Sequence, residues 1–141
     1  MEKTESQKIL IVDDEKNVCE ALKEIFVQTD YKLDFAYSGK ETMEKLQMES
    51  FNVIILDTTL PDINSFQLLE KIKHTDSLIR VIMMSWHTSA ESIAEAFQKK
   101  ASEFILKPFQ SRDVIKKVRK SLLFQRMSLT RERSKNLMPL D

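Results

Sequence analysis

Four short apolar runs in this chain each end on side chains that can bind a phosphate or a metal ion. The runs cover residues 9–12, 53–56, 81–84 and 104–106, and the polar side chains that follow them are Asp13, Asp14, Asp57, Ser85 and Lys107. Each run has the length of a β-strand that is buried on both faces, as in a parallel sheet. Because ligands bind beyond the carboxyl ends of parallel strands, the pattern predicts one site that collects these side chains.

Amphipathic helices are expected between these strands. Apolar residues recur every three or four positions within residues 15–29, 43–46, 66–72, 90–97 and 114–122. Ser38, with Glu41 three residues later, has the spacing of a helix capping box. Residues 33–37 alternate in polarity, which is typical of an edge strand. Right-handed crossovers then predict a flavodoxin-like, doubly wound α/β fold, in which five parallel strands in the order 2-1-3-4-5 and five helices form three α/β/α layers.

Length and composition indicate one domain. The 141 residues, 42% of them hydrophobic, suffice for a single core. The 22 basic and 22 acidic residues cancel, but residues 112–135 hold nine basic and two acidic side chains. The positive charge of this end would allow binding to nucleic acid, but no base-reading motif accompanies it. The other interpretation is a helix face exposed to solvent. The lack of a long apolar stretch argues against a membrane span, and Cys19 as sole cysteine favours a cytoplasmic location.

Three carboxylates at neighbouring strand ends predict a magnesium site. In the order 2-1-3-4-5 the first and third strands are adjacent, so Asp13, Asp14 and Asp57 share a crevice. Their mutual repulsion would be relieved by a divalent cation, and Mg²⁺ prefers oxygen ligands. His74 and His87 lie far apart in the pattern, which argues against zinc. Asp57 ends the central strand and is therefore the candidate nucleophile toward phosphorus.

The motifs together resemble the receiver domain of two-component response regulators over about residues 7–124. The matching stretches are Asp13-Asp14-Glu15, Asp57-Thr58-Thr59-Leu60-Pro61, Ser85 and Lys107-Pro108-Phe109, each with the apolar run before it. The resemblance implies that Asp57 accepts a phosphoryl group from the phosphohistidine of a sensor histidine kinase. It also implies that Asp14 and Asp57 bind Mg²⁺ directly, Asp13 through water, and Thr59 through its backbone carbonyl.

The same resemblance implies a conformational switch. Lys107 would place its charge against a phosphate oxygen, and the Ser85 hydroxyl would move toward the phosphate while the Phe104 ring turns inward. Phosphorylation would then favour a state that the protein already samples. The resemblance also suggests a cis peptide bond between Lys107 and Pro108.

Two departures from the receiver pattern concern glycine. Receivers usually have glycine at the positions of Ser65 and Lys100, whereas Gly39 is the one glycine of this chain. A left-handed backbone at Lys100 would cost about 1 kcal/mol, and a reshaped loop is the alternative.

A third departure is Trp86, which stands where the family has a small residue. The indole would either overhang Asp57 and slow phosphorylation by small donors, or pack over the fourth helix. Thr59 and His87 follow Asp57 and Ser85 by two residues, where they would contact an attacking water and tune dephosphorylation. The alternative is a solvent-exposed His87 without a partner.

The resemblance also predicts domains and partners. Residues 1–124 would form the receiver, and residues 125–141 a basic helical extension or linker. A stable coiled coil is not expected there, because Gln125 and Glu132 interrupt the heptad register. The expected partners are a sensor histidine kinase and an output domain or protein, with transcription the predicted output. A homodimer would form through the fourth helix, fifth strand and fifth helix, within residues 89–120.

Two other interpretations remain open on sequence alone. A haloacid-dehalogenase-like phosphatase uses the same type of nucleophile, but it needs a second acid where this chain has Thr59. A pseudo-receiver would have the fold and work without phosphorylation. Incubation with Mg²⁺ and a phosphodonor would separate both alternatives from a phosphoacceptor.

Overall fold

A five-stranded parallel sheet forms the centre of the protein. The computed structural model describes residues 7–137, with side chains described for residues 7–131. The strands are β1 (Lys8–Val12), β2 (Lys32–Ala36), β3 (Val53–Asp57), β4 (Arg80–Ser85) and β5 (Glu103–Leu106). They pair in parallel in the order β2-β1-β3-β4-β5, which confirms the predicted topology.

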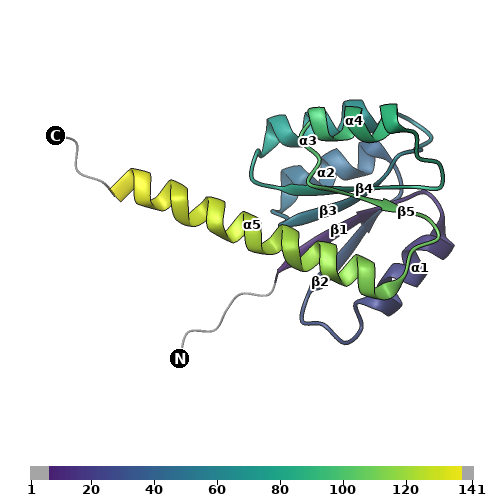
Figure 1. Ribbon diagram of the computed structural model, residues 1–141, viewed down its shortest axis with the longest axis horizontal. Coiled ribbons are helices and arrows are strands. Elements are labelled where there is room, and N and C mark those ends of the chain that lie inside the picture. The colour runs from purple at the N-terminus through teal and green to yellow at the C-terminus, as the bar shows by residue number, and fades with distance from the viewer. Residues whose placement is uncertain (1–6, 138–141) are drawn as a thin grey trace.

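Helices cover both faces of this sheet. Helices α1 (Lys16–Ile25) and α5 (Ser111–Leu137) lie on one face, and α2 (Gly39–Met48), α3 (Ser65–Thr75) and α4 (Ala90–Gln98) on the other (Figure 1). Successive strand residues point to opposite faces, so β1 places Leu10 in the core under α2–α4 and Ile11 in the core under α1 and α5. The two cores confirm the expected three-layer α/β/α fold.

The first two helices show how local sequence sets their ends. The Ser38 hydroxyl accepts the Glu41 N–H at 3.1 Å, which confirms the predicted cap at the start of α2. Helix α1 ends at Ile25 rather than near residue 29 as predicted. The Thr29 hydroxyl donates to the Phe26 carbonyl at 2.7 Å. This side-chain bond favours a turn over further helix.

The unusual backbone positions follow the sequence expectations in part. Lys100, two residues after the end of α4, has a φ of 74° and keeps the left-handed backbone. Ser65 begins α3 without positive φ, and its buried hydroxyl has no hydrogen-bond partner within the described chain. The peptide bond between Lys107 and Pro108 is cis, as expected.

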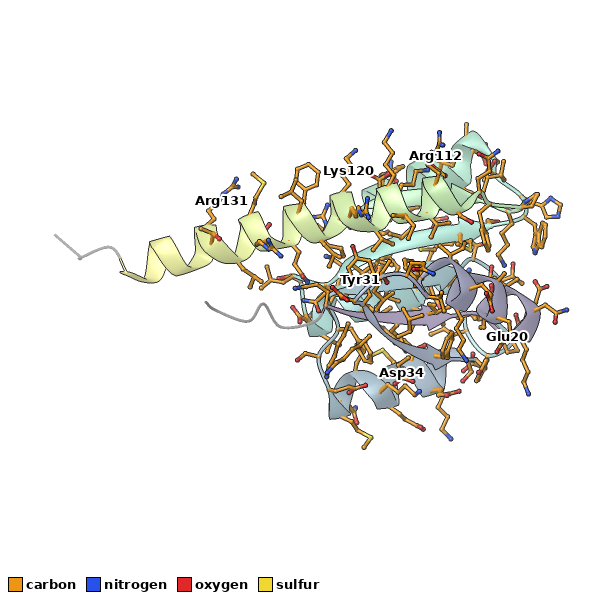
Figure 2. All side chains as sticks on the ribbon, turned by 90° about the horizontal axis from the view of Figure 1, so that it is seen from below. Glu20, Tyr31, Asp34, Arg112, Lys120 and Arg131 are labelled. Carbon is orange, nitrogen blue, oxygen red and sulfur yellow. The ribbon has the colours of Figure 1, made fainter. Side chains whose placement is uncertain are left out.

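Helix α5 runs on beyond the body of the protein. Figure 2 shows Arg112 and Lys120 on the part beside the body, and Arg131 on the part that projects from it. Gln125 is buried, and its amide nitrogen donates to the carbonyls of Asn52 at 2.9 Å and Leu78 at 3.0 Å. The Asn52 side chain in turn donates to Gln125 Oε1 at 2.9 Å. Thus Gln125 anchors α5 to the loops at the amino ends of β3 and β4.

Two further expectations concern the C-terminal extension and a membrane span. Positions 138–141 of the expected extension lie outside them. Among residues 7–137, no helix has the length and apolar character needed to cross a bilayer.

Candidate functional site

The predicted site residues stand at the carboxyl edge of the sheet. β1 and β3 are neighbours, with Val12 level with Leu56, so Asp13 and Asp57 at their ends are brought side by side. Ser85 ends β4, and Lys107 follows β5. A parallel sheet therefore delivers four separate segments to one edge, as the sequence predicted.

Three carboxylates meet at this edge. Asp13, Asp14 and Asp57 can each offer an oxygen such that all three oxygens lie within 4.8 Å of one another. Asp13 and Asp57 are buried, whereas Asp14 is exposed to solvent. One Asp13 oxygen accepts the backbone N–H of Glu15 at 2.9 Å, which fixes this carboxylate at the start of α1.

Lys107 lies between the two buried carboxylates. Its side chain is fully buried, and Nζ lies 2.8 Å from Asp13 Oδ2 and 3.3 Å from Asp57 Oδ1. Burial would lower the pKa of the Lys107 ammonium, but the bonds and charges of Asp13 and Asp57 outweigh burial and raise it. The lysine is therefore held in its charged form, and it compensates only part of the negative charge around it.

The uncompensated negative charge affects Asp57. Burial, and then the charge of Asp13, raise the pKa of Asp57 to about 6, although Lys107 and the Thr59 N–H act in the opposite direction. A divalent cation would stabilise the ionised form of Asp57, because it would offset the repulsion among the three carboxylates. The oxygen-only donor set is the type that Mg²⁺ prefers, so these residues fit such an ion.

The Ser85 hydroxyl is engaged by its own loop. Oγ donates to the His87 carbonyl at 2.7 Å and accepts the His87 N–H at 3.1 Å. His87 and Thr59 are both exposed at the rim of the site. To bind a group on Asp57, the hydroxyl would have to release the His87 carbonyl.

The Trp86 indole lies at the mouth of the site. Its Nε1–H donates to Glu15 Oε1 at 3.2 Å, and the Lys107 ammonium lies 5.6 Å from the centre of its ring. About half of the Trp86 surface is exposed. These contacts place the ring beside Glu15 and Lys107.

Phe104 lies apart from the carboxylates. Its half-buried side chain packs against the core under α4 and borders a surface hollow of about 410 Å³ that Ile93, Leu106 and Phe109 also line. The Phe104 ring thus connects the α4 side of the sheet with the surface between α4 and α5.

Glu15 is a site residue to which the sequence analysis assigned no role. Besides accepting the Trp86 indole N–H, its Oε1 lies 3.9 Å from Lys107 Nζ. The available signal was its place directly after Asp13-Asp14, where a third acid could also face the site.

Several known proteins are similar to this chain in sequence. Residues 9–119 match the family model of the response regulator receiver domain. Chemotaxis protein CheY of Bacillus subtilis is 31% identical over 118 residues, which cover 83% of this chain and 98% of CheY. Transcriptional regulatory protein CrdR of Helicobacter pylori is 34% identical over 105 residues, or 73% of this chain and 49% of CrdR. This chain therefore spans nearly all of CheY but about half the length of CrdR.

Solved structures with similar folds include a receiver domain protein from Methanospirillum hungatei. It superposes with a TM-score of 0.83 at 29% sequence identity, over 88% of this chain and 99% of that chain. A two-component response regulator from Clostridium difficile gives a TM-score of 0.79 at 26% identity, over 83% of this chain and 96% of that chain.

Proposed function

This chain belongs to the family of response regulator receiver domains, and we propose on that basis that Asp57 accepts a phosphoryl group from a sensor histidine kinase. The observation that supports the proposal is the position of Asp57, buried at a strand end between two other carboxylates and 3.3 Å from Lys107. A nucleophile in that setting has both a cation site and a positive side chain for the charge of a phosphoryl group.

The transfer would exchange one bond to phosphorus for another. An Asp57 carboxylate oxygen attacks the phosphorus of the phosphohistidine in line, and the bond from phosphorus to the imidazole nitrogen breaks. Lys107, now 3.3 Å from Asp57, would bind an oxygen of the transferred group. The product is an acyl phosphate on Asp57.

The acidic residues would hold the metal that this reaction requires. We assign Mg²⁺ to Asp14 and Asp57 directly, to Asp13 through water, and to the Thr59 carbonyl, and the bound charge would offset that of the phosphoryl oxygens. Asp14 is exposed and would bind the ion directly, whereas the Asp13 oxygens already accept from Lys107 and the Glu15 N–H.

Ser85 and Phe104 would transmit the modification. The Ser85 hydroxyl would leave the His87 carbonyl, which it contacts at 2.7 Å, and donate to the phosphoryl group. The loop after β4 would then move, which allows the Phe104 ring to turn inward from the surface hollow it borders. The resulting change lies on the surface of α4, β5 and α5, where a homodimer or an output partner would bind.

Residues at the rim would set the rates. Trp86, which bonds to Glu15 and lies against Lys107, would cover the pocket, so small phosphodonors would reach Asp57 slowly. Exposed Thr59 and His87 would contact the water that hydrolyses the acyl phosphate.

The division of the chain remains part of the proposal. Residues 1–124 would act as the receiver, and residues 125–141 would be a basic extension or linker toward an output domain or protein. Transcription control is the output named for CrdR, and we extend it to this chain as a proposal. The single thiol, buried Cys19, is compatible with the cytoplasm, where a sensor kinase would present its phosphohistidine.

Phosphorylation can be tested with acetyl phosphate as donor. Intact mass measured with and without Mg²⁺ should show one added phosphoryl group, dependent on the metal and lost in Asp57→Asn. Continuous phosphate release without a lasting adduct would instead indicate a phosphatase. No adduct from either acetyl phosphate or a phosphorylated sensor kinase would indicate a pseudo-receiver and refute the proposal.

The role of Trp86 needs a separate experiment. Trp86→Ala should accelerate phosphorylation by acetyl phosphate several-fold, because it opens the mouth of the pocket, while Trp86→Phe should retain most of the slow rate. Equal rates for all three proteins would show that the ring does not restrict access.

A further inference from the structure

A second polar cleft lies at the opposite end of the sheet from Asp57. It has a volume of about 650 Å³, lies between α3, α4 and the start of β4, and is lined by Glu70, Lys73, His74, Ser77, Arg80, Gln98, Lys99 and Lys100. We call it the α3–α4 cleft. Small-molecule sites typically have volumes of about 300–1,000 Å³, so the size suits a ligand. The lining holds four cations and an imidazole against a single carboxylate.

Two of these cations serve the fold. Lys73 Nζ donates to the carbonyls of Ser77 at 2.7 Å and Ile79 at 2.6 Å, after the end of α3. Lys99 pairs with Glu70 at 2.8 Å and with Glu95 at 3.0 Å. Cations at the carboxyl ends of helices are common because they complement the free carbonyls there. Lys73 and Lys99 therefore do not by themselves indicate a ligand.

Arg80 differs from these two lysines because one of its donors is unsatisfied. Its Nε is buried and forms no hydrogen bond within the described part of the chain. The guanidinium carbon lies 5.6 Å from the centre of the Phe124 ring, a contact that gives Nε no acceptor. A buried donor that lacks an acceptor is unfavourable unless a ligand or solvent satisfies it.

Lys100 is unusual in a different way. Its left-handed φ of 74° is a conformation that favours glycine, so a long side chain here is strained. The Lys100 ammonium forms no ion pair or hydrogen bond with the described side chains, 7–131. This residue thus adds a charge to the cleft without any visible gain for the fold.

The positive charges in the cleft also repel one another. Burial, and then the charge of Arg80, lower the pKa of Lys73, and Lys100 adds to this effect while Asp76 counteracts it. An anion between these groups would relieve the repulsion and supply the missing acceptor for Arg80.

We propose that the α3–α4 cleft binds a small molecule with a diphosphate group, held by Arg80, Lys100 and His74. A diphosphate carries enough charge for several cations, and its oxygens can accept two parallel bonds from a guanidinium. The hollow shape favours a small molecule over a broad protein surface. The inference is independent of phosphorylation at Asp57, which lies at the other end of the strands.

Pyrophosphate is a suitable probe, titrated into the full chain without Mg²⁺ or a phosphodonor. Calorimetry should give saturable binding, and amide NMR shifts should centre on Ser77, Arg80 and Lys100. Arg80→Gln and Lys100→Asn should each weaken binding about tenfold, the equivalent of one charge-assisted hydrogen bond. Asparagine tolerates a left-handed backbone, so the second variant removes charge without new strain. The control Lys71→Gln, at an exposed residue of α3 outside the cleft, should bind as the unchanged protein does.

Three results would overturn the proposal. Unchanged affinity in both folded variants would exclude the cleft as the site, as would NMR shifts confined to Asp57 and Lys107. A phosphopeptide that binds where pyrophosphate does not would assign the surface to a protein partner instead. Circular dichroism identifies folded variants, and if Arg80→Gln does not fold, Lys100→Asn alone decides.

Discussion

Replacing Asp57 with asparagine should stabilise this protein at neutral pH when divalent cations are absent. Asparagine has nearly the same shape but does not ionise. Burial and the charge of Asp13 raise the pKa of Asp57 to about 6, compared with an ordinary value of 3.8. At about 1.36 kcal/mol for each pH unit, the ionised carboxylate destabilises the folded state by about 3 kcal/mol. We expect Asp57→Asn to gain most of this free energy of unfolding.

The gain should depend on pH in a defined direction. The folded state binds the Asp57 proton more tightly than the unfolded chain does, because its pKa is higher in the folded state. The original protein therefore loses stability relative to the variant as pH rises from 3.8 to about 6, with the full loss above that range. Urea unfolding in EDTA, followed by circular dichroism from acidic to neutral pH, measures the difference. Added Mg²⁺ should stabilise the original protein more than the variant and reduce the gap.

A control at the same site tests whether burial is the cause. Asp14 belongs to the same cluster but is exposed, so Asp14→Asn should change the free energy of unfolding by less than about 0.5 kcal/mol. The reasoning would be refuted by an Asp57→Asn variant that is less stable than the original protein at neutral pH in EDTA. A gain of equal size at acidic pH would refute it as well.

Three further substitutions test contacts elsewhere, each by urea unfolding. Gln125→Ala should cost about 2 kcal/mol, because it removes a buried amide and leaves the half-buried groups that Gln125 bonds without partners. Exposed Arg126→Ala should change little, and equal effects would contradict the anchoring role. Lys100→Gly should stabilise the fold by about 1 kcal/mol through release of its left-handed backbone, and a loss would contradict that strain. Asp62→Ala should cost about 1 kcal/mol, since this carboxylate accepts the first two N–H groups of α2, and no change would mean that water replaces the cap.

Local sequence patterns predicted most of the fold and the carboxylate cluster of the site. The buried runs around Ile54 and Ile82 identified strands because a strand covered on both faces must be apolar throughout. Alternation near Asp34 separated an edge strand from the central ones, and placing that strand beside the first gave the observed order. The carboxylate cluster followed directly, because parallel strands bring their carboxyl ends to one edge.

Contacts between distant segments were not accessible in this way. Trp86 and Glu15 follow different strands, and no local pattern indicates that the indole N–H meets that carboxylate. The helical pattern marked Gln125 as a break in an apolar register, yet its amide is buried against Asn52 and Leu78. The early end of α1 depended on whether the Thr29 hydroxyl would compete with the helix, which periodicity does not reveal.

The sequence by itself determined the layers, the strand order and which chemical groups reach the acceptor edge, since burial and strand direction are encoded in short stretches. Only the tertiary structure decided which groups pair: Lys107 with both Asp13 and Asp57, Trp86 with Glu15, and Arg80 beside Lys100 in a cleft with an unsatisfied donor. Such pairings depend on distances of a few ångströms between separate elements, and those distances are set by how the whole core packs.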